Sequence, residues 1–302
     1  MDKSVFVLLI GDTRGEAVDL HQRLQAKEAL AEGDAAGLRV DVAWATSFDQ
    51  YRTLRKRLAA SSVDAVVAEP ASVPTAELIL KELKGRAGLV LLNVWDPLIE
   101  PYLASWGAGL PAGTISQPQR RIGEIQGRQV STVAPNGAGV LVVTGPSRSS
   151  AARERLDGLR ATIRPDVSIY STEAGQWLES DGILAFNSWY GIFKTRREEI
   201  HAIVGQSDDL AVGARKGGSA VPNPAHAAMF GKARLFGVGA CPGYGKELVD
   251  EGTLSASVSV RPNAGLAVGL LKRFWTDGSP LPAQSASEAE AYPATSIGPG
   301  AA

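Results

Sequence analysis

The stretch of the chain best suited to hold a small polar molecule is VTGPSRSSAARERLDGLRATI, residues 143–163. An apolar run ends at Gly145, three serines follow, and a strongly helical segment begins at Ala151 with arginine on its first turn. A strand-to-helix turn of this kind presents backbone N–H groups and the positive end of a helix dipole. These features indicate either a site for a polar or anionic ligand or only a well-capped helix, with Ser149 or Ser150 as the cap.

Arg153 carries the side chain in this stretch that could bind a ligand directly. A guanidinium offers five N–H donors in a fixed arrangement, which suits adjacent hydroxyls or a carboxylate. The helix taken alone favours the other interpretation, a surface arginine paired with Asp157 one turn later. We expect Arg155 to be solvated.

The sequence contains no pattern typical of an enzyme. GPSRSSAAR lacks the GxxxxGK[ST] spacing of a phosphate-binding loop, and ACPGYGK lacks the spaced third glycine that a dinucleotide site needs after a first strand. Neither a Ser-His-Asp nor a Cys-His arrangement can be argued from spacing. The three histidines are scattered, and a single cysteine excludes an internal disulfide and a cysteine zinc cluster. We therefore expect no catalytic residue, no cofactor and no metal.

Composition excludes two further classes of function. The formal net charge of −1 over 302 residues gives no basic field for nucleic acid. No apolar run approaches the roughly 18 residues that span a bilayer, so we expect no membrane insertion. The apolar run Val5–Ile10 is too short for a secretory signal and predicts a buried first strand. We expect a monomer, which is periplasmic if a leader was removed and cytoplasmic if Met1 is the native start.

Short apolar runs alternate with amphipathic segments along the whole chain. The expected strands are Val5–Ile10, Leu38–Ala43, Val63–Ala68, Gly88–Asn93, Gly139–Thr144, Val167–Tyr170, His201–Val204, Leu235–Val238 and Ser255–Val260. The expected helices are Val18–Ala35, Phe48–Ala60, Thr75–Leu83, Ala151–Ile163, Trp177–Trp189, Asp209–Gly217, Lys246–Glu251 and Asn263–Trp275. The segment GTISQPQRRIGEIQGRQV is expected to contain a strand entry and a further helix. Such alternation predicts an α/β protein with parallel sheets, and there are about twice the units of one doubly wound sheet. The Ala-, Ser- and Pro-rich tail, Gln284–Ala302, is expected to be irregular or partly disordered.

Six segments in this order resemble the type I periplasmic sugar-binding proteins, which share their fold with effector domains of lac-repressor-type regulators. The segments are HQRLQAKEALAEGDAAGLRVDVAWA, VDAVVAEPAS, LVLLNVWDP, VLVVTGPSRSSAARERLDGLRATI, IVGQSDDLAVGARKG and LFGVGACPGYGKELVDEGTLSASVSVRP. The resemblance covers nearly the whole chain. It implies two doubly wound lobes joined by a three-crossing hinge, with lobe one at 1–112 plus 262–288 and lobe two at 113–261 plus 289–302.

The resemblance also implies a ligand site at the strand ends of both lobes. It carries Arg153 into the cleft, matches Trp177 to an aromatic ring that packs on sugars, and places Asn93 at the end of a strand. The full set of expected ligand-binding residues is Asp12, Thr13, His21, Glu69, Asn93, Trp95, Arg153, Trp177, Ser207 and Asp208. For Asp208 the role of helix cap is the stronger expectation, and for His21 a structural role.

Three positions depart from the family pattern. Gly239 stands where the family has Asp, Val260 where it has Gln or Asn, and Val94 where some relatives have Arg. Each change removes a polar partner for a sugar ring. The resemblance therefore gives no simple ribose-like specificity. A smaller, flatter or less hydroxylated ligand stays open, as does a larger one with aromatic contacts.

Two functions follow from these expectations. The first is a non-catalytic solute-binding protein that closes its lobes on a small polar ligand, a sugar or sugar derivative, and is read by a membrane transporter or sensor. The second is a cytoplasmic ligand-sensing regulatory domain of the lac-repressor type without its DNA-binding segment. An enzyme on a doubly wound scaffold is the least favoured, because a fold alone implies no chemistry.

Overall fold

The chain forms two compact units in the computed structural model, which describes residues 2–11, 16–94, 96–195 and 198–298. One unit comprises Met1–Thr13, His21–Gln117 and Arg261–Glu288, and the other comprises Arg14–Leu20, Pro118–Val260 and Ala289–Ala302. The first unit thus continues to Gln117 rather than ending at residue 112, because the strand at 112–116 pairs within its sheet.

The first unit is built on one parallel sheet with the strand order β11-β5-β4-β3-β1-β2. Its elements are β1 (Ser4–Ile10), α1 (Glu16–Ala36), β2 (Arg39–Ala45), α2 (Gln50–Ala60), β3 (Ala65–Ala68), α3 (Val73–Leu83), β4 (Gly88–Leu92), α4 (Glu100–Ala104), β5 (Ala112–Ser116), α11 (Asn263–Asp277) and β11 (Gln284–Ala286). The chain adds β2 on one side of β1 and then β3, β4 and β5 on the other. The order of strands therefore reverses between β1 and β3.

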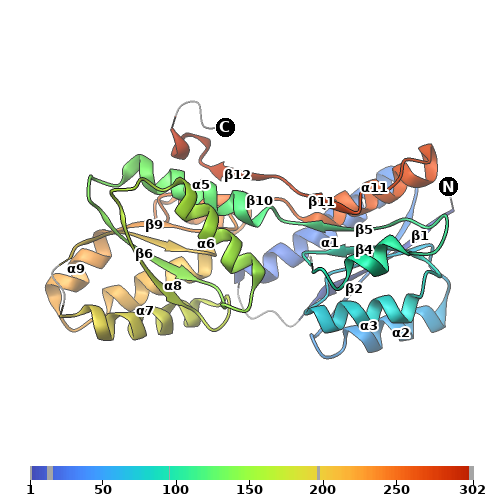
Figure 1. Ribbon diagram of the computed structural model, residues 1–302, viewed down its shortest axis with the longest axis horizontal. Coiled ribbons are helices and arrows are strands. Elements are labelled where there is room, and N and C mark those ends of the chain that lie inside the picture. The colour runs from blue at the N-terminus through green and yellow to red at the C-terminus, as the bar shows by residue number, and fades with distance from the viewer. Residues whose placement is uncertain (1, 12–15, 95, 196–197, 299–302) are drawn as a thin grey trace. The chain divides into compact units, whose positions relative to one another are not determined.

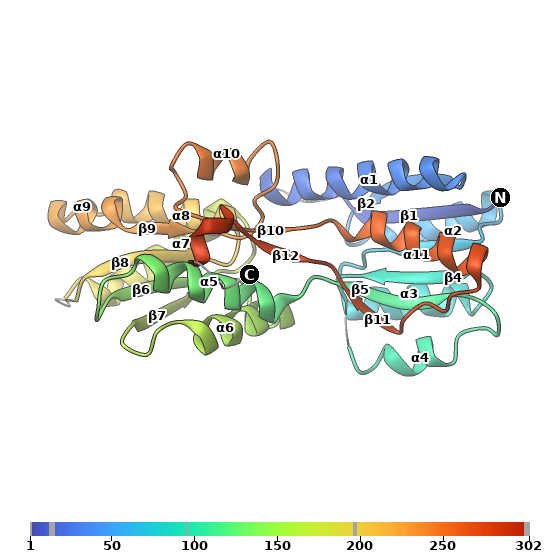
Figure 2. The ribbon, with the colours of Figure 1, turned by 90° about the horizontal axis from the view of Figure 1, so that it is seen from above.

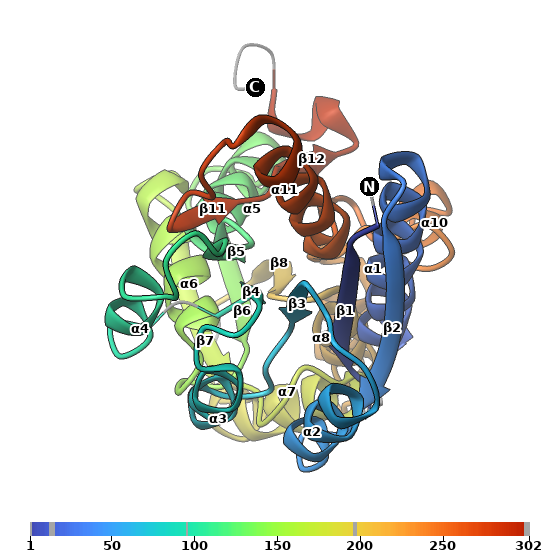
Figure 3. The ribbon, with the colours of Figure 1, turned by 90° about the vertical axis from the view of Figure 1, so that its right-hand side faces the viewer.

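Helices cover both faces of this sheet because successive strand residues point to opposite sides. On one face Phe6 and Leu8 of β1 pack with Leu54 of α2 and Ile79 of α3. On the other face β1 and β4 pack against α1 and α11 through a cluster that includes Val7, Val90, Ala29, Ala267 and Leu271. Figure 3 shows the sheet of this unit between α2 and α3 on one side and α1 and α11 on the other. The near-continuous apolar runs of the sequence thus correspond to strands buried on both faces.

The second unit repeats this design with a four-stranded parallel sheet of order β7-β6-β8-β9. Its elements are α5 (Gln119–Val133), β6 (Gly139–Thr144), α6 (Ser150–Thr162), β7 (Ser168–Glu173), α7 (Glu179–Phe193), β8 (Ile200–Gly205), α8 (Asp208–Ser219), α9 (Pro224–Lys232), β9 (Arg234–Phe236), α10 (Gly245–Asp250), β10 (Ser257–Val260), β12 (Ala289–Tyr292) and a 3₁₀ turn η1 (Ala294–Ile297). Here the strand order reverses between β6 and β8.

Two helical layers enclose the second sheet, with α5 and α6 on one face and α7, α8 and α9 on the other (Figure 1). The layer of α7, α8 and α9 contains an aromatic cluster. Trp189 stacks on Phe193 with their ring centroids 4.3 Å apart, and Phe186 meets Phe230 edge to face with centroids 4.8 Å apart. Trp189 packs against the core of this unit. None of the helices in the described residues is long and apolar enough to cross a bilayer.

The expectation of an irregular tail is wrong for its described part. β11 pairs in parallel with β5, and β12 pairs antiparallel with β10 (Figure 2). Ala289, Ala291 and Ile297 pack against an apolar cluster that contains Ile122 and Val258. The small residues of the tail therefore pack against the second unit instead of remaining irregular. α4 and α9 were not expected from the sequence, and the helix expected at Trp177 begins at Glu179.

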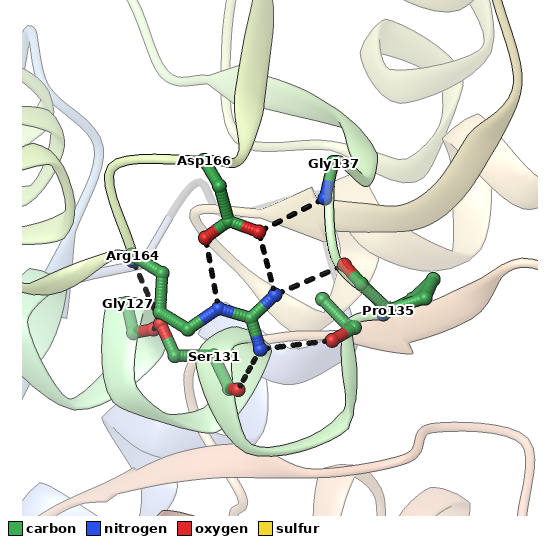
Figure 4. Close-up of polar contacts among 7 residues, drawn as sticks. Gly127, Ser131, Pro135, Gly137, Arg164 and Asp166 are labelled. Atoms are coloured by element: carbon green, nitrogen blue, oxygen red, sulfur yellow. Dashed lines mark hydrogen bonds and ion pairs between the residues drawn. The ribbon is translucent and has the colours of Figure 1, made fainter.

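Arg164 ties the end of α5 to the turn that leads into β7. Its Nη1 donates to Ser131 O at 3.1 Å and to Ala134 O at 3.0 Å, and its Nη2 donates to Pro135 O at 3.0 Å. Nε and Nη2 also bind the two oxygens of Asp166 at 3.0 and 3.1 Å (Figure 4). The Arg164 hydrogen bond and the Gly137 N–H together lower the pKa of Asp166 to about 2. The planar fork satisfies carbonyls that the end of a helix leaves without intrahelical donors.

We predict that Arg164→Lys lowers the free energy of unfolding by on the order of 1 kcal/mol at pH 7, because a lysine cannot reach the carbonyls and both carboxylate oxygens together. The pKa of Asp166 is 3.8 in the unfolded chain and about 2 in the fold, so the ionised carboxylate stabilises the fold at pH values above 3.8. This contribution is lost as the pH falls towards 2. The variant should therefore lose less stability than the native chain between pH 4 and pH 2. Urea denaturation at several pH values measures both effects. Arg160→Lys, at an exposed position on α6, is the control and should change neither.

Candidate functional site

The reversal of strand order marks the place where each sheet can bind a ligand. In an open α/β sheet, the helices that follow two neighbouring strands leave on opposite faces at this point and open a crevice at the carboxyl ends. In the first unit the crevice lies after β1 and β3, and in the second it lies after β6 and β8. The residues that follow these strands are therefore the candidates for a functional site.

Glu69 is the centre of a buried polar network in the first unit. It follows β3 and is 8% exposed. Its Oε2 accepts hydrogen bonds from Gln22 Nε2 at 2.7 Å and Gln25 Nε2 at 3.2 Å, both from α1. Its Oε1 accepts from Asn93 Nδ2 at 2.7 Å. The carboxylate is thus bound by three amide donors, which offset the cost of burying it.

Asn93 and Asn263 extend this network to α11. Asn93 has a φ of 55°, a left-handed conformation that asparagine tolerates better than most residues. Asn263 Nδ2 donates to Asn93 Oδ1 at 2.6 Å, and Gln25 Oε1 accepts from the backbone N–H of Asn263 at 2.8 Å. Two buried oxygens, Gln22 Oε1 and Asn263 Oδ1, accept no hydrogen bond from the described residues. The edge of the first sheet therefore keeps acceptor capacity that a hydroxyl could use.

His21 lies at the same edge, where its Nε2 is 3.4 Å from Gln117 Nε2. Asp12, Thr13 and Trp95, which the sequence analysis also expected at the site, lie outside the described residues. The structure thus brings Glu69 and Asn93 into direct contact, and it adds Gln25 and Asn263, which sequence analysis did not single out.

Gln206 joins the two strands that flank the reversal point in the second unit. It follows β8 and is 1% exposed. Its Oε1 accepts from the backbone N–H of Gly145, just after β6, at 2.9 Å, and its Nε2 donates to Ala152 O on α6 at 2.9 Å. The side chain replaces the backbone hydrogen bonds where the strands end, and it fixes the serine-rich turn between β6 and α6.

Arg155, not Arg153, is the arginine at this point, and the expectation that Arg155 is solvated is wrong. Arg155 is 8% exposed. Its Nε donates to Gln119 Oε1 at 2.7 Å, its Nη1 donates to Gln206 O, and its guanidinium lies 5.4 Å from the centre of the Trp177 ring. Burial lowers the pKa of Arg155 to about 10, so it stays protonated at neutral pH. A cation on the face of an indole is a stabilising arrangement.

Trp177 follows β7 and is partly exposed, so its ring borders the carboxyl edge of the sheet. A Cβ built on Gly145 would overlap this ring. The glycine therefore allows the indole to lie directly on the backbone of the turn. Trp177, Arg155 and the Gly145 turn therefore pack on one another, and they combine an apolar ring, a cation and backbone polar groups.

Arg153 lies on an exposed part of α6, where its Nη1 donates to Ser147 O at 2.8 Å. The structure contains no ion pair between Arg153 and Asp157, the alternative considered from the sequence. Ser149 caps α6 by accepting from Ala152 N at 3.4 Å, as expected. Glu173 accepts from Ser147 N at 2.7 Å, and this bond lowers the pKa of the carboxyl. Arg153 thus supports the turn from outside.

Ser207 and Asp208 have roles different from those the sequence favoured. Ser207 caps α8 by accepting from Leu210 N at 3.1 Å, so the cap is not Asp208. Asp208 is 0% exposed. Its Oδ2 accepts from Ala240 N at 2.8 Å and its Oδ1 from Ser257 Oγ at 2.7 Å. A Cβ at Gly237, Gly239 or Gly245 would collide with this carboxylate. Asp208 therefore anchors the segment after β9 from within the unit.

Glycine at position 239, noted as a departure from the family pattern, has a physical reason in this packing. Gly239 has a φ of 138°, which glycine adopts readily, and it leaves room for Asp208. Burial raises the pKa of Asp208 to about 6, while Ser257, Ala240 and Arg155 act in the opposite direction. No group of three or more residues that could hold a metal ion occurs in the described residues. The geometry offers hydrogen bonds, an aromatic face and a cation.

The comparisons with known proteins identify the fold. No protein-family model matches the sequence, and no curated protein matches it. The structure matches the periplasmic ribose ABC transporter of Conexibacter woesei DSM 14684 at a TM-score of 0.73, with 17% identity over 96% of this chain and 91% of that one.

Two further structures have the same architecture. The periplasmic solute-binding protein of Actinobacillus succinogenes 130z with bound D-allose matches at a TM-score of 0.74, with 15% identity over 96% and 97% of the two chains. The fructose-binding periplasmic domain of a hybrid two-component system matches at a TM-score of 0.73, with 17% identity over 96% of this chain and 90% of that one. The chain therefore has the two-lobe α/β fold of type I periplasmic binding proteins, and the expected fold class is confirmed.

We predict that Gly145→Ala displaces Trp177 from the turn, because the added methyl group occupies the position of the indole ring. The tryptophan emission should shift to longer wavelength as the ring becomes more exposed. Gly231→Ala, at a position where a Cβ meets nothing within 4 Å, is the matched control and should leave the emission unchanged. An unchanged spectrum of Gly145→Ala would show that Trp177 does not lie on this turn.

We further predict that Asp208 makes the stability of the chain depend on pH. Its pKa of about 6 in the fold is above the unfolded value of 3.8, so its stabilising contribution is complete below pH 3.8 and is lost as the pH rises through 6. Within this window the free energy of unfolding should fall by on the order of 1 kcal/mol per pH unit relative to Asp208→Asn, which cannot titrate. Denaturation of both chains from pH 4 to pH 7 measures the difference. Parallel curves would contradict the assignment.

Proposed function

We propose that the chain is a non-catalytic solute-binding protein that closes its two units on a small polar ligand, a sugar or sugar derivative. The observation that carries this proposal is the packing of Arg155, Trp177 and the Gly145 turn on one another at the strand reversal of the second unit. The similar proteins named above include a ribose transporter component, a protein with bound D-allose and a fructose-binding domain.

The chemistry of these groups suits a sugar. The C–H face of a sugar ring packs on an indole, and the guanidinium of Arg155 can donate to adjacent hydroxyls around the edge of the ring. The first unit would contribute Glu69 and Asn93, which present carboxylate and amide groups at its strand ends. Hydroxyls both donate and accept, so a mixed set of acceptors and donors is a suitable complement.

The proposed contacts differ in one respect from those expected from the sequence. We assign the ligand-facing guanidinium to Arg155, and we assign Arg153, Ser207 and Asp208 to positioning the turn and the segment after β9. Asp12, Thr13, His21, Glu69, Asn93, Trp95 and Trp177 remain in the proposed set of ligand-binding residues. Because Arg155 is already held by Gln119 and Gln206, it is preorganised, and little entropy is lost when a ligand binds.

Closure on the ligand would be read by a membrane transporter or a sensor. A binding protein stabilises its closed state by the difference in ligand affinity between its open and closed states, and a partner can recognise that state. The comparisons include both a transporter component and a domain of a two-component system. Nothing in them supports the alternative of a regulatory domain of the lac-repressor type.

The decisive experiment is a calorimetric titration with a panel of pentoses, hexoses in pyranose and furanose form, polyols and sugar acids. We expect one class to bind, to raise the melting temperature and to quench tryptophan fluorescence. Trp177→Leu should weaken that affinity by about tenfold or more, equivalent to about 1.4 kcal/mol, because leucine lacks the flat aromatic face.

Arg155→Lys and Arg153→Ala form a matched pair on one helix. Lysine keeps the charge of Arg155 but loses the fork, so affinity should fall by about tenfold or more. Arg153→Ala should weaken binding much less than Arg155→Lys does, because it removes only an exposed hydrogen bond to Ser147 O. If Arg153→Ala weakened binding and Arg155→Lys did not, Arg153 would be the arginine that contacts the ligand. If no compound in the panel bound, the proposed ligand class would be refuted.

A further inference from the structure

Glu69 of the first unit is a buried anion that forms no ion pair with the described residues. The groups that donate to its carboxylate are neutral amides, those of Gln22, Gln25 and Asn93. Asp64 of the same unit is more exposed, and yet its Oδ1 lies 2.8 Å from the Nζ of Lys3. The amides offset part of the cost of removing the Glu69 carboxylate from water, but they supply no opposite charge. The carboxyl edge of the first sheet therefore carries a negative charge that its neighbours leave uncompensated.

The backbone of Glu69 is fixed as well as its side chain. Its N–H donates to Leu8 O at 2.9 Å, and its carbonyl accepts from Gln50 Nε2 at 2.7 Å. Gln50 is 0% exposed, and its Oε1 accepts from Ala71 N at 2.8 Å, so this one side chain holds the turn after β3. The carboxylate is therefore preorganised at the strand reversal, and a ligand that binds it loses little of its affinity to ordering the protein.

The carboxylate also fixes the orientation of the amides around it. An ionised carboxylate only accepts hydrogen bonds, so each amide turns its NH2 group towards Glu69 and its oxygen away. Gln25 Oε1 accepts from the backbone N–H groups of Asn263 and Ala264, both at 2.8 Å. Gln22 Oε1 and Asn263 Oδ1 accept no hydrogen bond from the described residues. The network as a whole thus has an excess of acceptors over donors.

An ammonium group is the chemical complement of such a network. It offers three donors and no acceptor, and it carries the positive charge that Glu69 lacks as a partner. A carboxylate can accept about four hydrogen bonds, and the described residues supply three. A hydroxyl could donate at the remaining place, but it would leave the negative charge uncompensated once the ligand has displaced water from the edge of the sheet.

From these contacts we propose that the ligand carries a protonated amine that binds Glu69, so that its class is an amino sugar or an amino polyol. The inference rests on the proposed function and narrows the ligand class named there. Glu69 discriminates between an amine and a hydroxyl, while Trp177 and Arg155 bind the apolar face and the hydroxyls of the same ligand. A neutral sugar can make the second set of contacts but not the ion pair, and it binds more weakly for that reason.

Calorimetric titration of the native chain with matched ligands tests the inference at about pH 6.5, where an amine with a pKa near the roughly 7.7 of an α-amino group is mostly protonated. The probes are glucosamine, galactosamine, mannosamine, kanosamine and the amino polyol glucamine, each with its neutral parent and its N-acetyl derivative. At least one amine should bind about tenfold or more tightly than both of its neutral counterparts. If neutral sugars bind and no amine binds more tightly than they do, the inference is overturned and the proposed function stands. If none of these compounds binds, both fail.

Two variants of Glu69 separate the charge of the side chain from its shape. Glu69→Gln keeps the length and removes the charge, so the amine should lose most of its advantage over the parent sugar. Glu69→Asp keeps the charge and should retain part of that advantage. Asp34→Asn removes one charge of the same unit at an exposed position in the last turn of α1, and as the matched control it should leave the advantage unchanged. An amine preference that survives in Glu69→Gln would overturn the assignment to Glu69. The series on the native chain decides the ligand class even if a variant does not fold.

Discussion

The buried guanidinium of Arg155 is the interaction on which the candidate site depends. A charge removed from water is costly unless hydrogen bonds and opposite charges compensate it. Here Gln119 and the Gln206 carbonyl accept from it, Trp177 offers its aromatic face, and the Asp208 charge favours its protonated form. Because these partners come from α5, the end of β8, the segment after β7 and the start of α8, one cation fixes four segments around the strand reversal. A preorganised donor set of this kind is what a binding site for hydroxyls requires.

Much of the fold could be predicted because its rules are local. The apolar run Val5–Ile10 predicted a buried strand, and the structure has Ser4–Ile10. Alternation of short apolar runs with amphipathic segments predicted parallel sheets with helices on both faces. The tail could not be predicted in this way. Its strands are short and contain small residues, and they form only because β5 and β10 offer unpaired edges. Their partners lie far away in the sequence, so no local pattern reveals them.

The arginines of α6 show which part of the candidate site the sequence predicts and which part it does not. The turn and Trp177 were placed at the strand ends, but the choice between Arg153 and Arg155 depended on which face of α6 packs on α5. Arg153 and Arg155 are two positions apart, which is a rotation of about 200° on a helix, so their side chains lie on nearly opposite sides of α6. A signal was present, since Arg155 shares its face with the buried Ala152 and Leu159. Gln206 gave no comparable signal, because its importance comes from bonds to Gly145 and Ala152, which only the fold brings together.

Both units use buried amide side chains in place of backbone at their strand ends. In the first unit Gln25 and Asn263 hold Glu69 and Asn93, and in the second Gln206 holds the Gly145 turn. Amides can donate and accept, so they fix these positions without adding charge. The central claim is that the strand ends of both units bind one sugar. Amide hydrogen exchange of the native chain with and without a saturating sugar tests it most directly. The account predicts new protection at the residues around Glu69 and Asn93 and at the Gly145 turn together. Protection confined to one unit, or elsewhere in both, would contradict it.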